Sequence, residues 1–149
     1  MALIKRSCVL FVLIMILAGC SLQNNYESMK NGQLISGGRD TFYYKVNSKL
    51  ALSDDTGAST DYIKWIPNKM NTADDAVNYG TECYSAVFDK VYCTEDFVVI
   101  KLLKYEQYIV IDCTKPQSEC ITSYETPGDI DFDFMDYPVI DCIYPDELR

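Results

Sequence analysis

Carboxylates near the end of the chain are spaced so that they could do chemistry together. Asp129, Asp131 and Asp133 alternate with apolar residues, and in an extended strand they would share one face. Such a row could bind calcium, dock a basic protein or keep an edge strand soluble. An EF-hand loop would need Gly and Glu where Phe134 and Ile140 stand, which leaves only a looser calcium site.

Two tyrosines, Tyr124 and Tyr137, lie among these carboxylates. Tyrosine is enriched in interfaces because it combines rigid area with a polar tip, although it is also an ordinary strand residue. The candidate partner-binding residues are therefore Asp129, Asp131, Asp133, Tyr124 and Tyr137. The alternative interpretation is a solvated edge strand.

The chain contains no histidine. This excludes a Ser-His-Asp triad, a Cys-His pair and His-ligated zinc. No G-x-S-x-G, S-x-x-K or Gly-rich phosphate loop is present. The sequence predicts a non-enzymatic protein with no cofactor and identifies no catalytic or metal-ligating residue. An enzyme that works through a pair of carboxylates would require a cleft, which a sequence does not reveal.

Cysteines are the other reactive group. Five of the seven lie beyond residue 80: Cys83, Cys93, Cys113, Cys120 and Cys142. No C-x-x-C occurs, so neither a thioredoxin-type site nor a zinc ribbon is indicated. In an oxidising compartment we expect two structural disulfides and one leftover thiol. Cys113–Cys120 is the favoured pair, because these residues would flank a hairpin loop, and Cys83–Cys93 follows. Whether Cys142 is free or paired stays open.

The N-terminus carries a targeting pattern. Lys5 and Arg6 precede a short apolar run that ends in Leu17-Ala18-Gly19-Cys20, as in a secretory signal. The last four residues resemble the lipobox of bacterial lipoproteins. The resemblance covers only the targeting segment, and it implies cleavage before Cys20, a lipid on the Cys20 thiol and acylation of the new amine.

The same segment bears on the membrane. The apolar run is shorter than the roughly 20 residues that a spanning helix needs. In enterobacterial lipoproteins an Asp after the lipidated cysteine retains the protein at the inner membrane, and here that residue is Ser21. The resemblance therefore implies an outer-membrane lipoprotein facing the periplasm. We expect a signal over 1–19, a flexible tether over 20–39 and a single domain over 40–149.

Charge narrows the range of partners. The chain has 13 basic and 22 acidic residues and a formal charge of −9, which repels nucleic acid and anionic headgroups alike. The lipid at Cys20 would then hold the protein to the membrane, and a cationic protein would be its natural partner. Solubility alone is the alternative explanation of the charge.

Apolar alternation predicts a mainly β domain. The expected fold is a small antiparallel sheet or meander, sandwich or barrel-like, disulfide-stapled and with at most one short helix. Strands are expected over residues 42–52 with a bend at 46–49, and over 62–66, 84–92, 97–103, 108–113 and 120–124, with a loop at 53–60 and a helix at 72–80.

These observations together predict a membrane-anchored binding lipoprotein of the bacterial envelope. The leading hypothesis is an inhibitor or immunity protein that neutralises a toxin or a lytic enzyme. The alternative is a pilotin-like accessory or assembly lipoprotein of an envelope or secretion machine.

Overall fold

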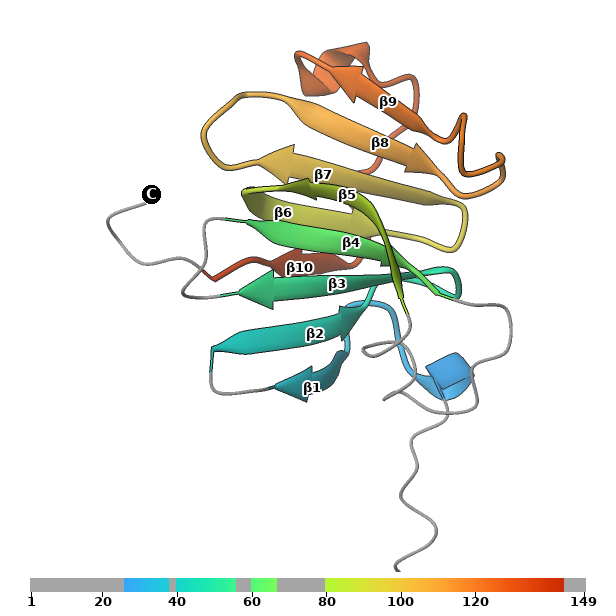
Figure 1. The fold of residues 1–149 in the computed structure, drawn as a ribbon. Coiled ribbons are helices and arrows are strands. Elements are labelled where there is room, and N and C mark those ends of the chain that lie inside the picture. Colours follow the sequence, from blue (N-terminus) through green and yellow to red (C-terminus); the bar gives the residue numbers. More distant parts are fainter. Residues whose placement is uncertain (1–25, 38–39, 56–59, 67–79, 144–149) are drawn as a thin grey trace, which may run out of the picture.

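The computed structural model describes residues 26–37, 40–55, 60–66 and 80–143, which form two five-stranded antiparallel sheets (Figure 1). Sheet A has the order β1-β2-β3-β4-β5, and sheet B has the order β10-β6-β7-β8-β9. The strands of sheet A are β1 (Leu34–Gly37), β2 (Thr41–Lys45), β3 (Leu50–Asp55), β4 (Asp61–Trp65) and β5 (Thr81–Ala86). Those of sheet B are β6 (Phe88–Cys93), β7 (Phe97–Leu102), β8 (Tyr108–Asp112), β9 (Ile121–Tyr124) and β10 (Val139–Asp141).

Helical structure is confined to two single 3₁₀ turns within the described residues, η1 (Tyr26–Ser28) and η2 (Pro127–Asp129). The mainly β, antiparallel prediction is confirmed. The helix expected at 72–80 lies outside the described residues except for its last position, as do the signal and Cys20.

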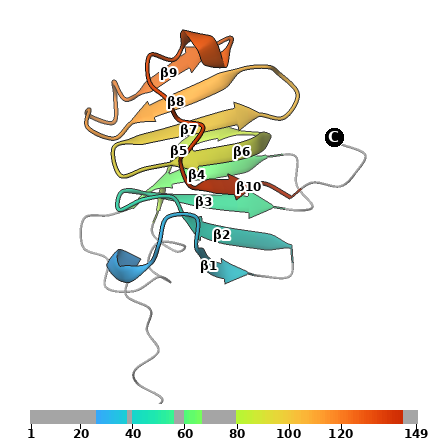
Figure 2. The ribbon, with the colours of Figure 1, turned by 180° about the vertical axis from the view of Figure 1, so that it is seen from behind.

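The core lies between the two sheets. Leu52 and Ile63 of sheet A and Ile100 of sheet B are 0 % exposed and belong to one apolar cluster. Alternate residues of each strand point to the same face, so the two inner faces bury each other as in a β-sandwich. The sheets overlap only in part, with β1 and β2 toward one end and β8 and β9 toward the other (Figures 1 and 2).

Strand β7 is buried on both faces. Val98 and Ile100 face sheet A, whereas Val99 belongs to a second apolar cluster on the outer face of sheet B. β7 is the middle strand of its sheet, as its continuous apolar run predicts.

The predicted strand over 84–92 is two strands in the structure. The chain passes from sheet A to sheet B at Val87, between β5 and β6. Ala86, Val87 and Phe88 are all apolar, so the strand-like composition continues through this position and did not reveal the crossing. The predicted bend at 46–49 is confirmed as the turn between β2 and β3.

Residues 26–37 belong to the folded domain, although the sequence assigned them to the tether. Tyr26 is 2 % exposed, and its hydroxyl donates to the carbonyl oxygens of Asn47 and Leu50 at 2.9 and 2.8 Å. The buried Lys45 holds the same turn, since its ammonium donates to three carbonyl oxygens at 2.9–3.3 Å, those of Tyr26, Glu27 and Met29. The domain therefore begins before residue 40.

Candidate functional site

Residues 125–138, here called the acidic strap, connect β9 to β10. Figure 2 shows the strap running from β9 across the outer face of sheet B to β10. Apart from η2, the strap has no regular structure. The prediction of an edge strand here is therefore wrong, although the alternation of acidic and apolar residues still separates two sides.

Apolar side chains hold the strap against sheet B. Ile130 and Phe134 are 7 and 2 % exposed, and the Phe134 ring lies 5.1 Å from that of Tyr92 and 5.9 Å from that of Tyr108. Phe132 packs against Phe97 with 4.7 Å between the ring centroids. The strap completes a second apolar layer, which covers the outer face of β7 and β8.

The carboxylates of the strap point to solvent. All of its acidic residues are exposed: Glu125, Asp129, Asp131, Asp133 and Asp136. Two of them make hydrogen bonds within the strap itself. Asp129 accepts from the Thr126 hydroxyl at 3.0 Å, and Asp133 accepts from the Met135 N–H at 3.2 Å. None of the ion pairs found within the described residues involves the strap. Its negative charge is therefore uncompensated.

The two tyrosines predicted for this site are mainly structural. Tyr124 and Tyr137 are half-buried and pack against the apolar layer beneath the strap. Tyr137 also stacks with Phe132 at 6.3 Å between ring centroids. The structure thus brings all five predicted residues to one face, with the three aspartates outward and the two tyrosines beneath them.

A hollow of about 230 Å³ opens between the strap and the ends of β8 and β9. Aromatic side chains of Phe97, Tyr124 and Phe132 line it together with the Asp131 carboxylate. The sequence did not reveal this hollow, because its walls come from β7, β8, β9 and the strap.

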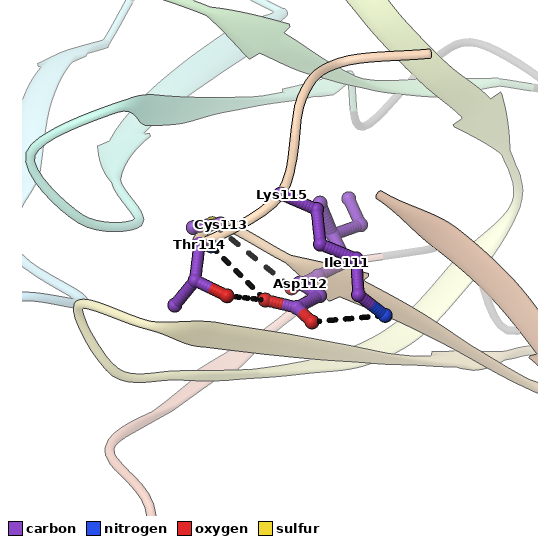
Figure 3. A network of polar contacts seen from close by, with 5 residues as sticks. All are labelled: Ile111, Asp112, Cys113, Thr114 and Lys115. Carbon is purple, nitrogen blue, oxygen red and sulfur yellow. Dashed lines mark hydrogen bonds and ion pairs between the residues drawn. The ribbon is translucent and has the colours of Figure 1, made fainter. Parts of the chain in front are cut away.

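At the rim of this hollow, Asp112 and Lys115 form an ion pair at 3.2 Å. The Asp112 carboxylate also accepts from the Thr114 hydroxyl at 2.6 Å and from its N–H at 3.0 Å (Figure 3). These hydrogen bonds, with that of the hydroxyl foremost, lower the pKa of Asp112. Because Asp112 is already paired, Asp131 is the uncompensated charge of the hollow.

A larger, more open hollow of about 500 Å³ lies at the β7–β8 turn. Its walls carry both signs of charge, among them Lys101, Lys104, Glu106 and Glu125. Lys101 is paired with Asp89 at 2.6 Å. With no set of convergent groups of one kind, this hollow indicates no ligand class.

A pair of buried carboxyls, Asp54 and Asp61, lies between the sheets. Both residues are 0 % exposed. Asp61 accepts from the Phe88 N–H at 2.8 Å, and Asp54 accepts from the Ile143 N–H at 3.1 Å. Phe88 begins β6 and Ile143 follows β10, so the pair fastens the β3–β4 hairpin to sheet B.

The two carboxyl groups also lie close enough to interact with each other. The Oδ1 atom of each carboxyl has no hydrogen-bond partner, and a proton shared between the two groups would satisfy both atoms. Burial raises the pKa of Asp54 and raises that of Asp61 from 3.8 to about 7. The sequence placed both residues in a loop or at its border, because aspartate is common in turns. Since neither is exposed, the pair forms no cleft of the kind that carboxylate catalysis would need.

The five described cysteines are free thiols. Cys113 and Cys120 flank the β8–β9 loop as predicted, but they are not bridged. Cys83 contacts Cys120, whereas Cys93, its predicted partner, lies beside the Pro138 carbonyl. The disulfide staples predicted from the sequence are therefore absent from the described part of the chain.

Comparison with protein families, curated proteins and solved structures finds no match to this chain. Within the described residues, no three His, Cys, Asp or Glu side chains gather closely enough to ligate a metal. Nor does the described part contain a helix with the length and apolar character needed to traverse a bilayer. The candidate site thus rests on the strap and its surroundings.

Proposed function

We propose that this chain is a lipid-anchored binding protein of the bacterial envelope whose acidic strap docks a cationic protein. The lipobox-like Leu17-Ala18-Gly19-Cys20 supports the anchor. Within this class, the proposed role is that of an inhibitor or immunity protein which neutralises a basic toxin or lytic enzyme.

The observation that carries the proposal is the division of the strap into two sides. Its buried side, with Ile130 and Phe134, packs on the outer face of sheet B. Its outer side adds a row of unpaired carboxylates, and like charges held together destabilise the strap rather than support it. A basic partner would relieve this repulsion and would be steered to the strap by it.

The hollow beside the strap suggests how such a partner would be oriented. A Lys or Arg side chain entering it would meet the Asp131 carboxylate and the rings of Phe132 and Tyr124. Carboxylates and aromatic faces both attract a cationic head. One inserted side chain would thus fix the register of a surface otherwise held by long-range charge.

The test replaces the three outward aspartates together. The wild-type chain and the variant Asp129→Asn/Asp131→Asn/Asp133→Asn, both immobilised by the same tag, are exposed to envelope extract and to culture supernatant, and captured proteins are identified by mass spectrometry. We expect basic proteins on the wild type and their loss on the variant. Association rates with the captured protein should fall in the variant, and the difference should shrink at high salt.

A matched control separates the strap from net charge alone. Glu82→Gln/Glu106→Gln/Glu119→Gln removes the same charge from exposed positions outside the strap. If both triple variants lose the partner equally, or if neither does, the strap is not the docking site. The identity of the partner distinguishes the two roles, since a toxin or lytic enzyme supports inhibition and a component of a secretion or assembly machine supports the accessory role.

A further inference from the structure

Two thiols from different sheets, Cys83 and Cys120, lie next to each other in the sandwich, and a third, Cys113, lies nearby. Cys83 lies on β5, Cys113 directly follows β8, and Cys120 directly precedes β9. The side chains of Cys83 and Cys120 interact with each other, and Cys113 lies close enough for electrostatic interaction with both. All three belong to, or pack against, the apolar core between the sheets.

A β-bulge turns Cys83 toward this core. Along β4 and β5, Ile63 pairs with Tyr84 and Lys64 pairs with Glu82, so Cys83 is the extra residue. Such a bulge places two successive side chains on one face. Cys83 and Tyr84 accordingly pack against the core, while Glu82 is exposed. The edge strand of sheet A thereby presents a thiol to sheet B.

Cys113 is less well placed to pair with Cys120. The register sets Ile111 opposite Ile121, which brings Asp112 rather than Cys113 across from Cys120, as the 2.8 Å bond from the Asp112 N–H to the Cys120 carbonyl shows. Cys113 and Cys120 both lie in the core cluster, but they are diagonal rather than directly opposite neighbours, and the side chain that interacts with Cys120 is that of Cys83. The Cys113 sulfur also accepts from the Asn47 side-chain amide at 3.3 Å.

We infer that Cys83 and Cys120 form a disulfide that joins the edges of the two sheets when the protein meets an oxidising disulfide. This pairing differs from both pairs expected from the sequence. It needs no contribution from the acidic strap and does not rest on the proposed function.

The reaction is a thiol–disulfide exchange in two steps. The Cys83 thiolate attacks one sulfur of an external disulfide and releases a thiolate, and the Cys120 thiolate then attacks the Cys83 sulfur and releases the second. Each cysteine gives up one proton, and two electrons reduce the external disulfide to two thiols. Cys83 reacts first because it is only half-buried, whereas Cys120 is 1 % exposed.

Burial also controls the rate of this exchange. It raises the pKa of Cys83 to about 12, so the thiolate is scarce at neutral pH. We expect the rate of bridging to rise roughly tenfold per pH unit between pH 7 and pH 9.

The test is a disulfide map of the full chain, purified in detergent, reduced, and then equilibrated with oxidised glutathione. Remaining thiols are blocked with N-ethylmaleimide, and the chain is digested without reduction. The expected result is a peptide pair joined through Cys83 and Cys120. A dominant Cys113–Cys120 pair, or alkylation of all three cysteines, would overturn the inference.

Three variants complete the design. Cys113→Ala and the double variant Cys93→Ala/Cys142→Ala should retain the Cys83–Cys120 peptide pair. Cys83→Ala should lose it. In thermal unfolding, oxidation should raise the midpoint of the wild type by on the order of 10 °C and leave that of Cys83→Ala unchanged. An equal rise in both proteins would assign the stabilisation to another pair.

Discussion

The buried pair of Asp54 and Asp61 predicts an unusual dependence of stability on pH. In the folded protein burial raises the pKa of Asp61 to about 7, against 3.8 for an ordinary aspartate, so the pair still holds a proton where an exposed aspartate has lost it. The folded state therefore binds more protons than the unfolded state between these values. The free energy of unfolding should be highest below about pH 4 on account of this pair and should fall as the pH rises toward 7.

The magnitude follows from the two pKa values. Each pH unit between them changes the free energy of unfolding by up to about 1.4 kcal/mol. The loss between pH 4 and pH 8 is therefore about 4 kcal/mol, a large part of the 5–15 kcal/mol that typically stabilises a domain. Carboxylates with a lowered pKa, such as Asp112 and Glu95, act in the opposite sense and in a lower window, because their stabilisation is lost only as the pH falls below about 4.

Asp61→Asn isolates this effect. The amide oxygen can accept from the Phe88 N–H, and the amide N–H can donate to Asp54, so the variant imitates the protonated pair. We expect urea denaturation to show similar stabilities for both proteins at pH 4.5, and a variant more stable than the wild type by up to about 4 kcal/mol at pH 8. Asp54→Asn should have the same effect on the free energy of unfolding, because either substitution replaces one of the two titrating carboxyls with a neutral amide.

Two results would contradict this reasoning. One is a wild type whose stability does not change between pH 5 and pH 8. The other is an Asp61→Asn variant that is less stable than the wild type at pH 8, which would show that the ionised pair contributes favourably. The strap variant with three aspartates replaced serves as a control, since its exposed carboxylates should leave the pH dependence of the wild type largely intact.

Further predictions concern the anchor, the strap and the N-terminal turn. Cys20→Ala should accumulate as an uncleaved precursor, and absence of fatty-acid label on the wild-type chain would reject the lipoprotein interpretation. Phe134→Ala should lower the free energy of unfolding, measured by urea denaturation, by about 3–5 kcal/mol, more than Phe132→Ala does. If Phe132→Ala lowers it more, Phe134 is not the residue that fixes the strap to sheet B. Lys45→Met should cost about 3 kcal/mol because it leaves three carbonyl oxygens without their donor, whereas Lys64→Met, at a half-buried position, should cost under 1 kcal/mol.

Most strands were predictable from their apolar residues, but the short edge strands β1 and β10 were not. The alternation of β2 and β3 follows from the sequence because burial of one sheet face imposes a period of two, and the continuous apolar run of β7 follows from burial of both faces. The crossing at Val87 was not predictable, since Val and Ala fit both a continuous strand and a link between sheets. Asp54 was misassigned for another reason: turn-forming residues are also buried where a neighbouring carboxyl and a backbone N–H satisfy them.

In the strap, the structure differs from what the local sequence pattern predicts, because tertiary packing decides it. Alternation of aspartates with Ile130, Phe132 and Phe134 is typical of a strand, yet the segment has no strand partner. The outer face of sheet B carries Val99, Val110 and Tyr108, and covering this apolar area outweighs the gain from an extended pairing. A sequence alone does not show that the second face of a sheet is apolar enough to need a cover, so the hollow beside Asp131 could not be foreseen.

The anchoring of Tyr26 limits how a lipidated molecule could stand on its membrane. Only five residues lie between Cys20 and Tyr26. A fully extended chain covers at most about 3.6 Å per residue, so the distance from Cys20 to Tyr26 is at most about 20 Å. A free segment of 20 residues would have allowed the domain to swing and turn. Because the segment from Cys20 to Tyr26 is short, the end of the sandwich that bears η1 would stay beside the lipid headgroups. Strand β9 lies at the opposite end in both views (Figures 1 and 2). It would point into the periplasm together with the beginning of the strap. Approach from the open periplasm would then meet carboxylates before it met the membrane.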